Sequence, residues 1–276
     1  MRIDGHTDII AHIGWPTYSF QAPLIYNPYF EQAGINALVV PMGCKPEHFS
    51  NYLKALFTLE NVRGALITMP HKVSVLSLLD DLSPRTRVAG ACNAVRRLPD
   101  GRLQGDMFDG EGFVRGVQRK GVELRGKRCM VVGAGGVGCA IAASLAQAGA
   151  AQLHLFDIHA ASSEALAQRL RENFPSVEVQ MGSNDPAGLD LLVNATPLGM
   201  KSGDALPVDM SRLSADTFVG EVVMAQEVTA FLAAAKAVGC PTQVGKDMLY
   251  EQIPAYLEYF GLPTTTAENL RSLALT

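Results

Sequence analysis

The 276-residue sequence lacks a run of basic residues, a Cys-x-x-Cys pair and an apolar segment at its start. Lys and Arg total 23 against 27 Asp and Glu, which gives a formal net charge of -4. The positive surface that nucleic acids and anionic membranes attract is therefore missing. The charged start of the chain, up to Asp8, does not resemble a signal peptide. These absences argue against nucleic-acid and membrane partners and predict a cytoplasmic protein.

The five cysteines do not form a disulfide or zinc framework by their spacing. Because their number is odd and none are paired in sequence, we expect reduced thiols. The six histidines lack a metal-ligand spacing, so no metal is expected. The stretch from Cys129 to Phe156 carries no Asp, Glu, Lys or Arg. Its Val-rich run, glycine turn and Ala-rich helical spacing predict a strand, a turn and a helix rather than a membrane span.

Short apolar runs alternate with helical patterns along the chain, which is typical of an α/β protein. In the first part, we expect strands at 8–13, 37–42 and 64–69 and helices at 23–33 and 46–57. Asp100-Gly101 predicts the turn of a hairpin. A second series of strands is expected at 128–132, 153–157, 177–181, 189–195 and 217–223. We predict a mainly parallel α/β domain at 1–112, a Rossmann-like doubly wound domain at 113–245 and returning C-terminal helices at 246–276.

A glycine-rich turn follows the first strand of the second series. It reads Gly133-Ala-Gly135-Gly136-Val137-Gly138. The first glycine permits a tight turn, the second lets the backbone approach a pyrophosphate, and the third lets the helix pack on the strand. The next strand ends in Asp157, whose carboxylate can bind a ribose diol and repels a 2′-phosphate. The pattern predicts a dinucleotide cofactor and favours NAD over NADP. NADP stays an alternative, because Arg169 and Arg171 could reach a 2′-phosphate.

Two charged residues stand where chemistry is expected. Lys72 ends the segment Thr68-Met-Pro-His-Lys after an expected strand, and Asp109 stands at an expected helix start. Open α/β sheets bind ligands at the carboxyl ends of their strands. A Lys and an Asp facing one cleft can relay the proton that leaves an alcohol as its carbon loses hydride. Taken alone, each residue is also typical of an exposed surface.

Several motifs occur in one order along nearly the whole chain: Gly14-Trp15-Pro16 with Pro23, Thr68-x-Pro70-x-Lys72, Gly90-Ala-Cys-Asn93, Gly105-x-x-x-Asp109-Gly110-x-Gly112, Gly133-Ala-Gly-Gly136, Asn194-Ala-Thr-Pro-Leu-Gly-Met200, Thr229-x-Phe-Leu232 and Gly245-x-x-Met-Leu-x-x-Gln252. In these motifs the sequence resembles the shikimate dehydrogenase family. The resemblance implies a substrate domain, a cofactor domain and a cleft between them. It also implies an NAD(P)-dependent oxidoreductase of aromatic amino acid biosynthesis that acts on shikimate- or quinate-type alcohols, as a monomer or homodimer.

The resemblance assigns roles to individual residues. Lys72 takes the hydroxyl proton, and Asp109 orients it or exchanges protons with it. Three positions match those that hydrogen-bond the hydroxyls of the substrate ring: Thr68, Asn93 and Gln252. The cofactor positions are the glycine turn, Asp157 and three later residues: Thr196, Met200 and Gly245.

The sequence departs from the family where the substrate carboxylate is bound. Members that use shikimate carry Ser-x-Ser before the proline equivalent to Pro23, whereas this chain has Phe20-Gln21-Ala22. A family tyrosine aligns with Met224. These swaps replace polar contacts with apolar bulk, so we expect shikimate to bind poorly unless Ser19 or Gln21 supplies the anchor.

Other interpretations stay open. Phe20, Phe108 and Met224 are alternatively plain core residues. The substrate is alternatively a less polar cyclic hydroxy acid, or the protein is an inactive NAD-binding regulator. A methylene-tetrahydrofolate dehydrogenase is disfavoured, because Thr68 stands where a Tyr-x-x-x-Lys spacing requires tyrosine.

NADP-using members carry Asn-Arg-Thr where this chain has Asp157-Ile-His159, which reinforces the NAD prediction.

Overall fold

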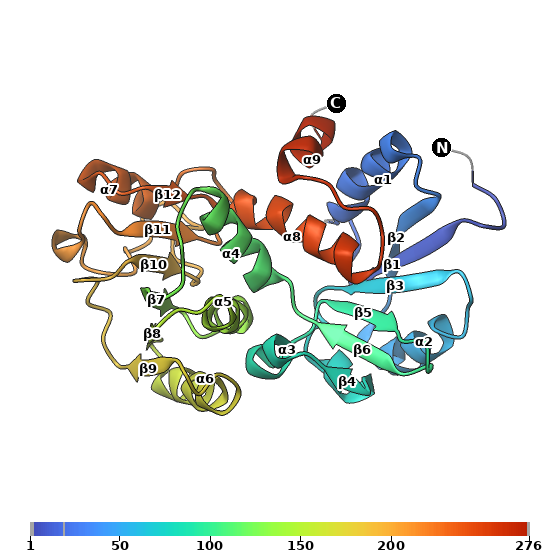
Figure 1. Ribbon diagram of the computed structural model, residues 1–276, viewed down its shortest axis with the longest axis horizontal. Coiled ribbons are helices and arrows are strands. Elements are labelled where there is room, and N and C mark those ends of the chain that lie inside the picture. The colour runs from blue at the N-terminus through green and yellow to red at the C-terminus, as the bar shows by residue number, and fades with distance from the viewer. Residues whose placement is uncertain (1–2, 19, 275–276) are drawn as a thin grey trace. The chain divides into compact units, whose positions relative to one another are not determined.

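The computed structural model describes residues 3–18 and 20–274 and confirms the α/β class, with two mostly parallel sheets (Figure 1). The chain forms two compact units. The first unit comprises Met1–Thr86, Gly90–Phe108 and Ile253–Thr276, and the second comprises Arg87–Ala89 and Asp109–Gln252. The two units are defined by contacts within the chain and do not test which segments fold as domains. The domain limits expected from the sequence therefore remain predictions.

The sheet of the first unit has the strand order β2-β1-β3-β5-β6-β4. Its strands are β1 (Asp8–Gly14), β2 (Ala37–Gly43), β3 (Val62–Ile67), β4 (Asp81–Leu82), β5 (Ala94–Arg97) and β6 (Leu103–Asp106). β1 runs parallel to β2 and β3, and β4 runs parallel to β6. β5 is antiparallel to β3 and β6. The predicted hairpin is therefore confirmed, and Gly101 supplies its left-handed residue with φ 89°.

Four helices of the described chain flank this sheet, and the sequence predicts two of them, at 23–33 and 46–57, close to their observed positions. They are α1 (Ala22–Ala33), α2 (Pro46–Leu56), α3 (Pro84–Ala89) and α9 (Ala267–Ala274), with a 3-10 turn at Ser74–Leu78. α1 has a proline in its first turn and ends at Gly34, which has φ 65°. Ala11 and Ile13 of β1 pack with Phe49 and Leu53 of α2 in the core of the first unit.

The sheet of the second unit is parallel throughout, in the order β12-β11-β10-β7-β8-β9. Its strands are β7 (Arg128–Val132), β8 (Gln152–Phe156), β9 (Glu178–Met181), β10 (Leu191–Asn194), β11 (Phe218–Glu221) and β12 (Thr242–Gln243). This is the doubly wound order, whose ligand crevice lies where the order reverses, between β7 and β10.

The helices of the second unit are α4 (Asp109–Arg119), α5 (Gly136–Gln147), α6 (Ala160–Asn173), α7 (Ala230–Val238) and the start of α8 (Gly245–Tyr259), with a 3-10 turn at Met210–Arg212. The boundary between the units falls inside α8, after Gln252. The uncharged stretch 129–156 forms β7, α5 and β8, as predicted. No helix in the described part of the chain is long and apolar enough to cross a membrane.

A buried carboxyl group ends β11. Glu221 has no exposed surface, and its Oε2 accepts a hydrogen bond of 2.8 Å from the hydroxyl of Thr229. Burial raises the pKa of Glu221 to about 6, while bonds from Thr229 and Asn194 lower it by less. The fold therefore holds the proton of this carboxyl more tightly than the unfolded chain does.

We expect Glu221→Gln to stabilise the protein above neutral pH. Because the folded pKa lies above the unfolded value, wild-type stability falls as pH rises from about 4.5 to about 6 and stays lowered beyond it. Glutamine does not ionise, so the gain is about 1–2 kcal/mol at pH 8 and close to zero at pH 4. Urea unfolding at both pH values measures it, with Glu164→Gln on exposed α6 as the control. An equal effect at both pH values contradicts this account.

Candidate functional site

The glycine turn of the second unit is tight on one side and open on the other. Gly133 has φ 103°, and a Cβ there would lie 2.8 Å from the carbonyl oxygen of Ala195. A Cβ on Gly138 would overlap the carbonyl oxygen of Gly133. At Gly135 and Gly136, by contrast, no described atom beyond the adjoining residues and the backbone of α5 lies within 4 Å of the Cβ position. The open side is the N-terminus of α5, where free N–H groups favour phosphate.

Asp157 is fixed beside this turn. Its Oδ2 accepts a hydrogen bond of 2.7 Å from the backbone N–H of Ala134, and its Oδ1 accepts one of 2.8 Å from that of His159. The carboxylate oxygens retain lone pairs, because each can accept two hydrogen bonds. The geometry therefore fits a ribose held next to a pyrophosphate.

Arg169 and Arg171, the two arginines that could bind the 2′-phosphate of NADP, both donate hydrogen bonds to backbone carbonyl groups. Arg169 donates from Nε to the carbonyl oxygen of Val88 at 2.7 Å. Arg171 donates from Nη2 to the carbonyl oxygen of Val179 at 2.9 Å. Each guanidinium thus already binds the backbone of α3 or β9, and the residue that follows Asp157 is the exposed apolar Ile158.

A second loop closes the same edge of the sheet, after β10. Asn194 accepts through Oδ1 from the hydroxyl of Thr196 at 2.6 Å and donates through Nδ2 to the carbonyl oxygen of Leu198 at 3.0 Å. The Cγ2 of Thr196 lies 3.0 Å from the Cβ position of Gly133, so this loop touches the glycine turn. Met200, further along the loop, is exposed. The structure thus brings the glycine turn, Asp157 and Thr196 to the reversal point of the sheet.

Four other expected site residues also belong to the second unit. Asp109 is the first residue of α4 and is buried. Gly245 opens α8, and a Cβ there would overlap the carbonyl oxygen of Val223. Gln252 is 8% exposed, and no described residue hydrogen-bonds its Oε1. Met224 is 42% exposed, so its interpretation as a core residue is wrong.

In the first unit, the segment that carries Lys72 is held at the carboxyl end of β3. The backbone N–H of Thr68 donates to the carbonyl oxygen of Ile13 at 2.9 Å. The ring of His71 stacks on Phe49 at 3.9 Å between centroids. The backbone N–H of Cys92 donates to the carbonyl oxygen of Lys72 at 2.8 Å. These contacts fix the backbone before, within and at the end of the segment.

Asn93 ties this segment to the end of β6. Its carbonyl oxygen accepts from the N–H of Ile67 at 2.9 Å, and its Oδ1 accepts from the N–H of Phe108 at 2.9 Å. Phe108 is 4% exposed and packs against Tyr256 and Tyr259, which confirms it as a core residue. The first unit thus holds Thr68, Lys72 and Asn93 on adjoining segments.

The departure from Ser-x-Ser lies at the carboxyl end of β1. A Cβ on Gly14 would lie 2.9 Å from Cζ of Phe20, whose ring stacks on His12 at 4.1 Å between centroids. Ala22 is half-buried at the start of α1. Ser19, one of the two alternative carboxylate anchors, lies outside the described residues. The expected loss of polar contacts to the substrate carboxylate therefore stays a prediction.

His12 is the residue of this region that sequence reasoning missed. It is 8% exposed, and burial, followed by the positive charge of Lys72, lowers its pKa to about 4. The imidazole is therefore neutral at physiological pH. The only sign of it in the sequence is a titratable residue inside the apolar run of β1. Its contact with Phe20 joins two separate segments, so the sequence alone does not show that contact.

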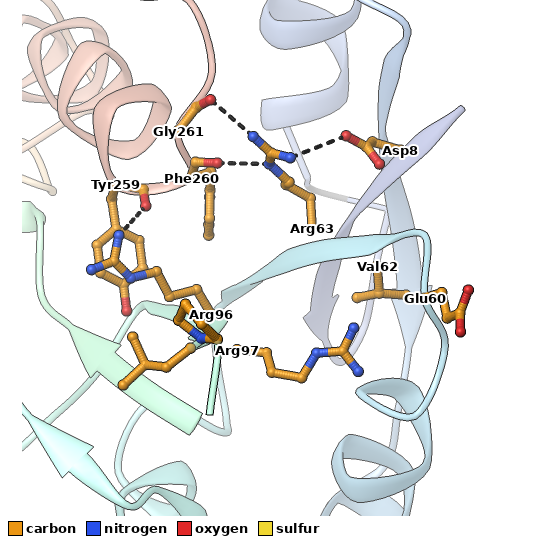
Figure 2. A pocket seen from close by; sticks show the side chains of 11 residues that line it. Asp8, Glu60, Val62, Arg63, Arg96, Arg97, Tyr259, Phe260 and Gly261 are labelled. Carbon is orange, nitrogen blue, oxygen red and sulfur yellow. Dashed lines mark hydrogen bonds and ion pairs between the residues drawn. The ribbon is translucent and has the colours of Figure 1, made fainter. Parts of the chain in front are cut away.

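A cavity of about 440 Å³ lies at the other edge of the first unit's sheet (Figure 2). Two of its three arginines bind the carbonyl groups at the end of α8: Arg63 donates to Phe260 at 2.8 Å and Gly261 at 2.9 Å, and Arg96 donates to Tyr259 at 2.6 Å. The third, Arg97, donates to the carbonyl oxygen of Phe57 at 2.8 Å. Cations at a helix C-terminus offset its dipole and its unpaired carbonyls. This cavity therefore anchors α8, and it contains none of the expected site residues.

Known proteins match both parts of the chain. The sequence model of the shikimate dehydrogenase substrate binding domain matches residues 13–95, and that of the ThiF family matches 114–169. A shikimate dehydrogenase (NADP(+)) of Rubrobacter xylanophilus is 34% identical over 278 residues, which are 99% of this chain and 98% of that protein.

Two solved structures share the fold over nearly their whole length. The shikimate 5-dehydrogenase of Listeria monocytogenes, in complex with shikimate and NAD, has a TM-score of 0.91 at 26% identity and covers 99% of this chain and 98% of its own. The ligand-free 5-ketofructose reductase of Gluconobacter sp. strain CHM43 has a TM-score of 0.88 at 30% identity and covers 98% of each chain. Together with the full-length sequence match, these likenesses show that the chain belongs to the shikimate dehydrogenase family and is an NAD(P)-dependent oxidoreductase acting on a CH–OH group.

Proposed function

We propose that the protein transfers hydride between a ring secondary alcohol of the shikimate or quinate type and NAD, with Lys72 and Asp109 handling the hydroxyl proton. The observation that supports this most is the rigid attachment of the Lys72 segment at the carboxyl end of β3, where the N–H of Cys92 holds the carbonyl of Lys72. A proton acceptor must keep a defined position relative to the reacting hydroxyl.

The proposed roles follow the chemistry of alcohol oxidation. The bound dinucleotide supplies the acceptor for the hydride that leaves the carbon. Lys72 receives the hydroxyl proton, so the alcohol becomes a ketone and one proton is released. Asp109 exchanges that proton with Lys72, while Thr68, Asn93 and Gln252 bind the other hydroxyls of the ring. In the reverse direction, the same amine returns the proton to the ketone oxygen.

Lys72→Met removes the proton acceptor and keeps an unbranched side chain. We expect kcat to fall at least about 100-fold, because positioned proton transfer contributes a factor of this order. The affinity for NAD, measured by calorimetry, is expected to stay unchanged. Lys54→Met on the exposed face of α2 is the matched control.

Full turnover by Lys72→Met would remove Lys72 from the mechanism. Wild-type protein that binds NAD but oxidises no cyclic alcohol would instead support the inactive regulatory protein.

We also propose that NAD is preferred over NADP. Asp157 carries a negative charge beside the expected ribose, and a 2′-phosphate there meets like-charge repulsion. Arg169 and Arg171 bind backbone carbonyls, and neither Ile158 nor His159 is an arginine. The Rubrobacter relative is named for NADP(+), so this preference sets the chain apart from that relative.

Asp157→Asn tests the preference for NAD. Loss of the charge is expected to lower the ratio of kcat/KM for NAD over NADP at least about tenfold, since tenfold corresponds to about 1.4 kcal/mol. Asn retains an acceptor for the N–H of Ala134 or of His159. Asp216→Asn, an exposed change in the same unit, is the control. A wild-type enzyme that prefers NADP, or a ratio unchanged by Asp157→Asn, contradicts the proposal.

The substrate side supports a second candidate, a neutral polyhydroxy ketone or alcohol without a carboxylate. Phe20 and Ala22 offer no hydroxyl where the shikimate-using members bind the acid. The 5-ketofructose reductase of Gluconobacter is 30% identical to this chain, shares its fold and is named for a neutral sugar. A less polar cyclic hydroxy acid fits the same apolar replacement.

The double variant Phe20→Ser with Ala22→Ser tests this assignment of the carboxylate site. Restoring two hydroxyl donors is expected to raise kcat/KM for shikimate at least about tenfold, because each buried hydrogen bond to a charged group contributes about 1.5–3 kcal/mol. Initial rates with shikimate and quinate measure the effect, and Leu24→Ser, exposed on α1, controls for added serine. Fast shikimate turnover by the wild type would show that another residue anchors the acid.

We place the protein in the cytoplasm, acting on a small-molecule substrate. All five cysteines are free and buried, which supports a reducing compartment.

A further inference from the structure

The two faces of β1 have different surroundings. Side chains alternate along a strand, and Ala11 and Ile13 pack into the core beside α2. His12 and Gly14 therefore share the opposite face, which the ring of Phe20 covers. That ring stacks on His12 at 4.1 Å and comes within 2.9 Å of the Cβ position of Gly14. Gly14 has no side chain here because Thr68, Met69 and Phe20 fill the space.

His12 brings an unpaired polar atom to this face. Its side chain is 8% exposed, and its Nδ1 has no hydrogen-bond partner in the described part of the protein. A buried nitrogen without a partner costs about 1–3 kcal/mol. A buried unpaired group in a folded protein calls for an explanation, and a functional role is one of the recognised explanations.

The position of His12 connects it to the proposed chemistry. The positive charge of Lys72 is close enough to contribute to the low pKa of His12. Thr68, a proposed substrate contact, lies with Phe20 around the same Gly14. His12, Phe20, Thr68 and Lys72 therefore occupy neighbouring positions at the carboxyl ends of β1 and β3.

We propose that His12 is a specificity-determining residue whose Nδ1 hydrogen-bonds an uncharged oxygen of the substrate, a hydroxyl or carbonyl, where shikimate-using members bind the carboxylate. This inference rests on the proposed hydride transfer and favours the second candidate substrate, a neutral compound without a carboxylate. A neutral imidazole can donate or accept one hydrogen bond at Nδ1 but supplies no positive charge. Stacked against Phe20, it selects for a neutral polar group and against a carboxylate, because a buried unpaired charge is costly.

The pair shikimate and methyl shikimate tests this selection, since the ester lacks the negative charge of the acid and adds only a methyl group. We expect wild-type protein to favour the methyl ester. His12→Leu removes the nitrogen and keeps bulk, so kcat/KM for the ester is expected to fall at least about tenfold, mainly through KM, with a smaller change for shikimate. His12→Asn places an amide near the position of Nδ1 and is expected to restore most of the loss.

His154→Leu is the matched control. His154 is a half-buried histidine on β8 of the second unit, its pKa is also lowered by burial, and its Nε2 likewise lacks a partner among described residues. Equal losses for both substrates in His12→Leu, or the same pattern in His154→Leu, overturn the inference.

Failure of the proposed function is distinguishable from failure of this inference. If the wild type turns over neither compound, calorimetric binding of methyl shikimate in the presence of NADH replaces kinetics. Weaker binding by His12→Leu, restored by His12→Asn, then supports the role of His12 without hydride transfer. Binding that His12→Leu leaves unchanged, or no binding by the wild type, overturns it.

Discussion

Parallel strands bring their carboxyl ends to one edge of a sheet, and this constraint governs where the protein can bind anything. In the second unit, the glycine turn follows β7, Asp157 follows β8 and the Thr196 loop follows β10, all at one edge of the sheet. In the first unit, the segments that carry Phe20 and Lys72 follow the carboxyl ends of the parallel strands β1 and β3. Close backbone contacts then fix each loop, which is why glycine stands at 14, 133 and 138.

Local patterns predicted most of this framework. Apolar runs located the long strands, and Asp100-Gly101 located the hairpin, because both signals lie within a few neighbouring residues. The two-residue strands β4 and β12 had no periodicity to detect, since tertiary pairing alone defines them. The stacking of Phe20 on His12 and the exposure of Met224 depend on packing between distant segments, so the sequence could not separate a core from a site role there.

Charge is the property on which both proposed ligand sites of this protein depend. At the cofactor, Asp157 brings a negative charge next to the glycine turn. At the proposed substrate site, the ring of Phe20 stacks on His12, and no Ser-x-Ser precedes Pro23. Both differences concern the proposed selection of ligands, whereas Thr68-x-Pro70-x-Lys72 and the glycine turn match the motifs of the family.

The arginine-lined cavity in Figure 2 has a consequence for the search for inhibitors. Its guanidinium groups are positively charged, yet Arg63 and Arg96 already bind carbonyl groups at the end of α8. An acidic compound that docks there must compete with the helix end for the same N–H donors. Such a compound would act by loosening α8, which carries the proposed substrate contact Gln252, so substrate and compound would weaken each other's binding without sharing a site.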